Sequence, residues 1–151
     1  MISSTANSRV KHVVQLREKG RERKKEGVFL AEGIRMFQET PASRIRELYI
    51  EETLAERPQT EDFSEKIEAC RQAGIFVETV SSEVMKKMAD TMSPQGVLVV
   101  AEMFAYQPEE LIREAVKRRE QEGRDPLFLL LEDVQDPGNL GTMIRTAEGA
   151  G

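Results

Sequence analysis

Short apolar runs alternate with segments of helical periodicity along residues 8–101, and this alternation constrains the fold more than any other feature. Each run has the length of a strand, and the segment 61–73 between two of them carries one apolar stripe at helical spacing. Strands that alternate with helices predict an α/β domain built of packed layers. The predicted strands are residues 28–31, 45–50, 75–77 and 97–101, with helices around Val10, Met36, Ile67 and Met85 and a loop or frayed helix end over 21–27.

The chain contains one cysteine and one histidine, which excludes several kinds of chemistry. A single cysteine excludes an intrachain disulfide, and the pair cannot supply a structural zinc site, so we expect no metal. His12 lies in a strongly charged segment, which leaves little room for Ser-His-Asp catalysis. Cys70 falls on the apolar helix stripe, so we expect it in the core. No run reaches the roughly 18 apolar residues of a membrane helix and no signal peptide is evident, so a cytoplasmic protein is expected.

The net charge of −5 conceals an asymmetry between the N-terminal arm and the rest of the chain. Residues 1–27 carry eight basic and three acidic side chains, a net charge of +5, which leaves −10 on residues 28–151. A basic arm on an acidic body suits contact with a polyanion, and it equally suits a solvated helix face. Composition leaves both interpretations open. We expect phosphate contacts from Lys11, Arg21, Arg23 and Lys24.

Residues 106–151 differ in composition from the segment before them. The stretch 106–124 is highly charged, and Glu114 and Arg118 at i, i+4 spacing predict a solvated helical linker. The apolar run 126–131 is typical of a strand covered on both faces, and it is followed by one helix. A single strand and helix cannot bury such a strand, so this unit either extends the first sheet or begins an incomplete second domain, and we favour the second. The predicted domains are 1–105, 106–124 and 125–151.

The turn at residues 136–139 is the most informative local feature. Pro137 and Gly138 predict a type II turn, and Asn139 is a preferred helix N-cap. The helix that follows directs Arg145 away from its apolar face, between Gly141 and Gly149, where a phosphate could approach the guanidinium closely. The same pattern also fits an ordinary strand-turn-helix with an exposed arginine. The spacing is neither that of a Rossmann dinucleotide site nor that of a P-loop.

Residues 136–145 carry the spacing Asp-Pro-x-Asn-x-Gly-x-x-x-Arg. Together with Leu129 to Gln135 before it and Thr146, Ala147 and Gly151 after it, this stretch resembles the first motif of the SpoU (TrmH) family of RNA ribose methyltransferases. Weaker pieces in the N-terminal part fall in the same order as in that family's substrate-binding domain. They are Ile2-Ser3-Ser4 with Asn7, Val10, Lys11 and Leu16, then Phe29-Leu30-Ala31-Glu32-Gly33, and then Ser93-Pro94-Gln95-Gly96-Val97.

The resemblance implies an α/β fold with two parts. The first is an L30e-like α/β/α sandwich that binds RNA, and the second is the first strand-helix unit of an α/β-knot (SPOUT) methylase domain. The implied activity is S-adenosylmethionine-dependent 2′-O-methylation of ribose in RNA, expected to be ribosomal RNA, by an enzyme that works as a homodimer. The chain would then be an N-terminal fragment without most of the cofactor site, which is expected beyond Gly151, so the 151 residues alone are expected to be inactive.

The resemblance also assigns roles to individual residues. Arg145 matches the arginine proposed to act with an RNA phosphate in activating the ribose hydroxyl. Asn139 matches the asparagine that shapes the catalytic site, and Glu132 occupies the acidic position at the end of the strand. In the substrate-binding part, the resemblance adds Asn7, Glu32 and Gly33 to the expected RNA-binding residues.

An alternative of a different class is a non-catalytic RNA-binding adaptor built on the L30e-like domain. The two hypotheses share the basic arm and differ in the sequence expected beyond Gly151. About one hundred further residues with a Gly-rich strand-turn signal would favour the enzyme, whereas a natural stop would favour the adaptor.

Overall fold

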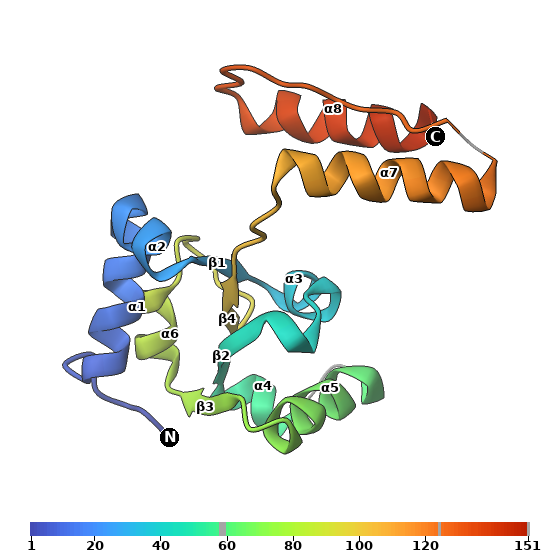
Figure 1. The fold of residues 1–151 in the computed structure, drawn as a ribbon. Helices are drawn as coiled ribbons and strands as arrows, with labels where there is room; N and C mark the ends of the chain where they lie inside the picture. The colour runs from blue at the N-terminus through green and yellow to red at the C-terminus, as the bar shows by residue number, and fades with distance from the viewer. Residues whose placement is uncertain (58–59, 124, 151) are drawn as a thin grey trace. The chain divides into compact units, whose positions relative to one another are not determined.

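The computed structural model describes residues 1–57, 60–123 and 125–150, which fall into two compact units, Met1–Phe104 and Ala105–Gly151 (Figure 1). Gly151, part of the predicted motif, and Arg124, part of the predicted linker, lie outside the described residues.

A mixed sheet forms the centre of the first unit. Its described strands lie in the order β1-β4-β2-β3, with β4 antiparallel to both of its neighbours and β2 parallel to β3. Ile2 extends the β3 edge through an isolated bridge to Val80. The strands are β1 (Val28–Glu32), β2 (Ile45–Glu51), β3 (Phe76–Val80) and β4 (Val97–Glu102), so all four predicted strands of this region are confirmed.

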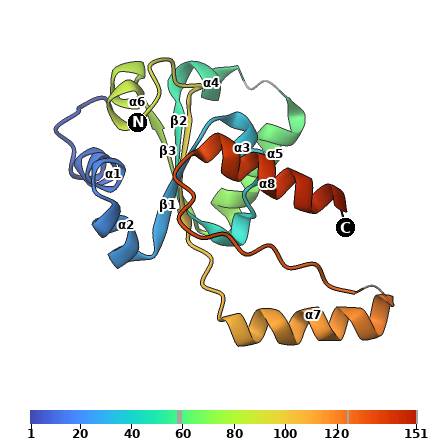
Figure 2. The same cartoon turned by 90° about the horizontal axis from the view of Figure 1, so that it is seen from above.

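Helices cover both faces of this sheet, as Figure 2 shows with the sheet nearly edge-on. On one face, α1 and α6 bury apolar side chains against Tyr49, Leu98 and Val100 of the sheet, and α2 follows α1. This layer consists of α1 (Ser8–Glu18), α2 (Gly20–Glu26) and α6 (Ser82–Met88), and its buried helical residues are Val10, Val13, Leu16, Val84, Met85 and Met88.

The opposite face of the sheet receives the remaining helices of the unit. Phe37 and Phe63 meet edge to face with their ring centroids 5.3 Å apart, a favourable aromatic geometry. Cys70 is fully buried beside them in this core, as predicted from the helix stripe. The elements are α3 (Ile34–Glu39), a short 3₁₀ turn (Ala42–Arg44), α4 (Glu52–Glu56) and α5 (Glu61–Gln72). The predicted α/β/α sandwich is therefore observed.

The segment 21–27 differs from its prediction. The sequence indicates a loop or frayed helix end, whereas the structure forms α2 there. Gly27 explains the difference, because its left-handed conformation, with φ 66°, lets its N–H reach the carbonyls of Arg23 and Lys24 and ends the helix cleanly.

The second unit contains α7 (Pro108–Glu122) and α8 (Pro137–Ala150). The predicted strand over 126–131 is not formed, because residues 125–136 are extended or irregular and pair with no strand of the described chain. A strand requires a hydrogen-bonding partner, and its apolar side chains stay open here, Leu130 being 89% exposed. Within the described residues, no helix is both long enough and apolar enough to cross a bilayer.

Candidate nucleic-acid interface

The end of β1 is joined to the loop that follows α6. The carboxylate of Glu32 accepts hydrogen bonds from the backbone N–H groups of Asp90, at 2.9 Å, and Thr91, at 3.3 Å, and from the Thr91 hydroxyl. The N–H of Gly33 donates to the carbonyl of Val97 at 2.9 Å. Glu32 is therefore occupied in holding the loop in place.

Gly33 meets Gln95 at the same junction. Gly33 has φ 103° and ψ 158°, a conformation that favours glycine, and a Cβ there would lie 2.9 Å from Oε1 of Gln95. That oxygen accepts the N–H of Ile34 at 3.2 Å. Two of the N-terminal sequence pieces that carry the family resemblance, 29–33 and 93–97, are thus brought together although they lie far apart in the chain.

The basic residues of the arm fall into different environments. Lys11, Arg21 and Lys24 are exposed, and among the described residues none of them contacts an acidic side chain. Arg23 instead directs its Nη1 onto the carbonyls of Leu16, at 2.6 Å, and Arg17, at 2.8 Å, at the end of α1. Its guanidinium therefore satisfies carbonyls that the helix leaves open.

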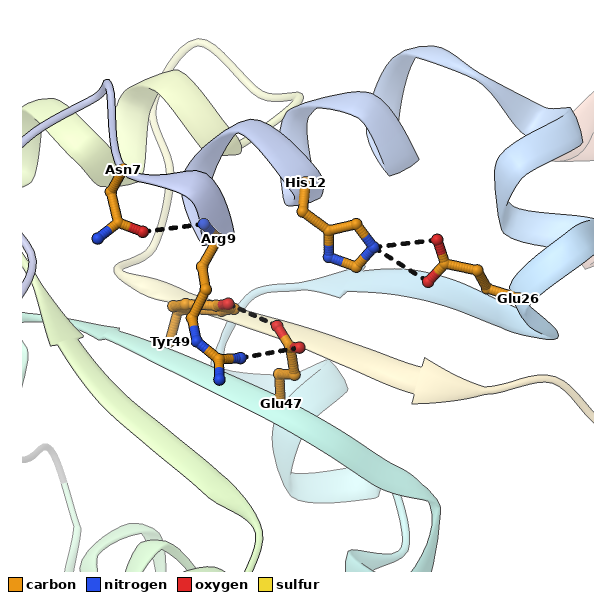
Figure 3. A network of polar contacts seen from close by, with 6 residues as sticks. All are labelled: Asn7, Arg9, His12, Glu26, Glu47 and Tyr49. Carbon is orange, nitrogen blue, oxygen red and sulfur yellow. Dashed lines mark hydrogen bonds and ion pairs between the residues drawn. The ribbon is translucent and has the colours of Figure 1, made fainter.

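Asn7 caps α1, and a polar network surrounds this end of the helix (Figure 3). The Asn7 side chain accepts the N–H of Arg9 at 2.9 Å, and Arg9 pairs with Glu47 at 3.3 Å. Glu47 also accepts the hydroxyl of Tyr49. Burial, followed by the hydrogen bond to Glu47, raises the pKa of Tyr49 far above its usual value. These groups are committed to the fold.

His12 connects the first two helices of the arm. Its Nε2 lies 3.0 Å from both carboxylate oxygens of Glu26, so the contact ties α1 to the end of α2 (Figure 3). The histidine is thereby engaged in a helix contact, and among the described residues no hydrogen bond joins it to a hydroxyl or thiol side chain.

Two grooves lie near the helices of the arm. A groove of about 270 Å³ is lined by residues that include Arg17, Arg23, Glu32 and Asp90, so it brings together Arg23 and Glu32, two of the predicted RNA-binding residues. A separate groove of about 190 Å³ is lined by residues that include Lys11, Lys19 and Lys87. Sequence reasoning missed Lys19 and Lys87. The signal for Lys87 was the Lys86-Lys87 pair in the last turn of a predicted helix, but its proximity to α1 is a tertiary contact.

The start of α8 differs from its prediction. Asp136, not Asn139, acts as the capping side chain, because its Oδ1 accepts the Asn139 N–H at 2.7 Å. Pro137 is the first helical residue, a position where its missing N–H costs nothing. Gly138 lies inside the helix without a positive φ, so the predicted type II turn is also wrong.

Arg145 is exposed on α8, as are most residues of this helix. Its Nη2 donates to Oγ1 of Thr142 at 3.2 Å, and its Nη1 lies 3.3 Å from the point where a Cβ on Gly141 would stand. The guanidinium therefore extends along the glycine, as the helical spacing predicts. Asn139 and Glu132 are exposed too, and within the described residues no hydrogen bond or ion pair joins either of them to Arg145.

A groove of about 330 Å³ lies between residues 127–129 and α8, and Thr142 and Thr146 of the helix line it. Its hydroxyl-bearing residues, Thr142 and Thr146, donate to the backbone carbonyls of Gly138 and Thr142, both at 2.9 Å. S-adenosylmethionine carries a sulfonium, a carboxylate, an ammonium and a ribose, which require several free polar partners. This groove alone therefore does not form a site that fits the cofactor. The described residues also bring no three potential metal ligands together.

Comparison with known families identifies the first unit. The sequence profile of the MRM3-like substrate binding domain matches residues 7–99. The chain belongs to this family. The matched range of the MRM3-like domain contains β1, β2, β3 and the first half of β4, most of the arm, and the junction between Gly33 and Gln95.

Relatives extend the similarity beyond the MRM3-like domain. The chain is 32% identical over 152 residues to the Bacillus subtilis 23S rRNA (guanosine(2553)-2'-O)-methyltransferase RlmP, covering 99% of this chain and 51% of the relative. It is 36% identical over 85 residues to the putative TrmH family tRNA/rRNA methyltransferase YacO of Bacillus subtilis, covering 56% of this chain and 32% of the relative. The resemblance to SpoU (TrmH) methyltransferases is confirmed.

A solved structure supports the same assignment. An AdoMet-bound rRNA methyltransferase from Sinorhizobium meliloti matches with a TM-score of 0.63 and 27% identity, over 99% of this chain and 51% of that one. The predicted fold class is thus confirmed by a neighbour as well as by the sheet. The chain spans about half the length of the curated relative RlmP and of this structural neighbour.

Proposed function

We propose that this chain supplies the RNA-binding domain and the first methylase motif of an S-adenosylmethionine-dependent 2′-O-ribose methyltransferase that acts on ribosomal RNA. The observation that carries the proposal is one continuous chain that joins an MRM3-like substrate binding domain over 7–99 to the motif ending at Arg145. RlmP, whose name states 2′-O-methylation of 23S rRNA, aligns with both parts over 99% of the chain.

Arg145 is proposed as the phosphate-holding residue. A ribose hydroxyl is a poor nucleophile, and its reaction depends on alignment with the methyl donor and on removal of its proton. A guanidinium can hold an RNA phosphate through two parallel hydrogen bonds, and the glycine beside Arg145 leaves its surroundings open. S-adenosylmethionine supplies a methyl group already activated by its sulfonium. Asn139 and Glu132 are proposed to shape the same site.

In the RNA-binding domain, the proposal gives the predicted residues two kinds of role. Lys11, Arg21 and Lys24 present free cationic groups and are proposed to contact phosphates. The residues whose side chains or backbone are engaged in the fold are proposed to shape the RNA-facing surface; they are Asn7, Arg23, Glu32 and Gly33.

The assembly and location of the protein are further parts of the proposal. We propose a homodimeric cytoplasmic enzyme that requires no metal. The open apolar side chains of residues 127–131 support an assembly that covers them, because an uncovered patch of this kind is costly in water. The proposed boundaries of the RNA-binding domain, the helical linker and the methylase part are 1–105, 106–124 and 125–151.

Mapping of ribose methylation in the source organism tests this function. Deletion of the gene is expected to abolish 2′-O-methylation at one position of ribosomal RNA. A 2′-O-methyl group protects the adjacent phosphodiester from alkaline hydrolysis, so the loss is measured as new cleavage at that position. The wild-type gene should restore the mark, and a gene encoding Arg145→Ala should not. If the complete methylation pattern survives deletion while the protein still binds ribosomal RNA, the non-catalytic adaptor is the correct interpretation.

A further inference from the structure

A lysine-lined groove runs along the outer seam between α1 and α6. Lys11 lies on α1, Lys19 is the C-terminal cap of that helix, and Lys87 lies in the last turn of α6. Lys11, Gln15 and Lys19 are spaced at i, i+4 and i+8, which places them along one side of the helix. All three lysines are exposed, although the helices that carry them are anchored in the same core.

The neighbouring arginines remove the negative charge that would otherwise oppose an anion here. Both helices end near this groove, and helix C-termini present open carbonyls with partial negative charge. Arg17 donates to the carbonyls of Lys87, at 3.0 Å, and Ala89, at 2.8 Å, at the end of α6. Arg23 does the same for the end of α1 through the carbonyl of Leu16, at 2.6 Å.

The one carboxylate among the groove-lining residues is also compensated. Glu18 pairs with Nη2 of Arg17 at 3.0 Å. The groove therefore presents lysine ammonium groups whose charge is not cancelled locally, beside the neutral side chains of Thr5 and Gln15, which can donate further hydrogen bonds.

From this arrangement we propose that the α1–α6 groove binds the phosphodiester backbone of the RNA substrate, with Lys11, Lys19 and Lys87 as phosphate contacts. The proposal rests on the proposed function, since that function supplies the RNA. It assigns to α6 a part in RNA binding, and it assigns Arg17 and Arg23 to positioning the groove rather than to the RNA. Flexible lysine side chains suit a sequence-independent track along phosphates.

The expected effect comes from counterion release. Each phosphate contact to single-stranded RNA contributes about 0.7 to the slope of log K against log salt. At about 0.1 M salt, that slope corresponds to roughly fivefold in the binding constant per contact. Loss of all three lysine contacts should therefore weaken binding about a hundredfold and reduce the slope by about 2.

The experiment measures RNA binding by the 151-residue chain through fluorescence anisotropy. The probe is a fluorescein-labelled, single-stranded RNA of mixed sequence, titrated between about 50 and 300 mM KCl. The variants are Lys11→Ala, Lys19→Ala and Lys87→Ala, singly and combined. Lys86→Ala is the matched control, because it removes the same charge from the adjacent position of α6 outside the groove. Thermal unfolding by circular dichroism verifies that each variant is folded.

The proposal is supported if the triple variant loses about a hundredfold in affinity with a flattened slope while Lys86→Ala stays close to wild type. It is overturned if the groove variants and Lys86→Ala weaken binding equally, or if none of them changes the slope. In either result the wild-type chain still binds RNA, so the proposed function still stands. If the wild-type chain does not bind the RNA, the groove proposal is also overturned. The methylation map of the deletion strain then tests the proposed function separately.

Discussion

Replacement of Gly33 by alanine is expected to lower the free energy of unfolding of the first unit by about 2–4 kcal/mol. The conformation of Gly33, with φ 103° and ψ 158°, costs any other residue about 1–3 kcal/mol. The added methyl group would also lie 2.9 Å from Oε1 of Gln95, so that side chain has to move. Its hydrogen bond from the Ile34 N–H, which contributes about 0.5–1.5 kcal/mol, is then lost.

Urea denaturation followed by far-ultraviolet circular dichroism measures this loss. Gly27→Ala is the matched control, because Gly27 has φ 66° but open space around its Cβ position, so only the backbone strain of about 1 kcal/mol is expected there. In a Gln95→Ala background, Gly33→Ala should cost about 0.5–1.5 kcal/mol less, because the displaced hydrogen bond is already absent. A loss below about 0.5 kcal/mol, accompanied by weaker RNA binding, would refute the conformational argument and show that Gly33 serves close approach of the RNA.

Three further outcomes test other contacts. Arg145→Ala should leave thermal unfolding unchanged and reduce methylation of ribosomal RNA by about 100-fold or more in a complementation assay, and a destabilised variant would make Arg145 structural. Arg23→Ala should cost about 1–2 kcal/mol in urea denaturation, because it leaves the carbonyl end of α1 open, without changing the salt slope of RNA binding; a reduced slope would assign Arg23 to the RNA. Because the pKa of Tyr49 is raised in the folded state, the folded protein keeps a proton that the unfolded chain loses above about pH 10. The free energy of unfolding should therefore fall above that pH by up to about 1.4 kcal/mol per pH unit. Urea denaturation at several pH values should show that Tyr49→Phe removes this dependence.

The elements of the first unit were predictable because each carries its own signal. The stripe of Phe63, Ile67 and Cys70 defines a buried helix face, and the continuous apolar run of β4 marks a strand buried on both faces, with Val97 and Val99 on one side of the sheet and Leu98 on the other. The apolar run 126–131 has an equally clear signal yet forms no strand. Helix hydrogen bonds close within the segment, so α8 forms from its own residues, whereas a strand depends on a partner that the described residues do not provide.

The candidate site shows the corresponding difference among charged residues. A sequence counts Lys11 and Arg23 as equivalent cations, but the structure directs Arg23 onto helix carbonyls and leaves Lys11 in solvent. It likewise brings Lys87 beside α1, which no local pattern indicates. Around Arg23, less charge is available to RNA than the net +5 of the arm suggests. Beside α1, more charge is available, because Lys87 of α6 contributes. Because counterion release counts only the contacts actually made, the salt slope of RNA binding measures this redistribution directly.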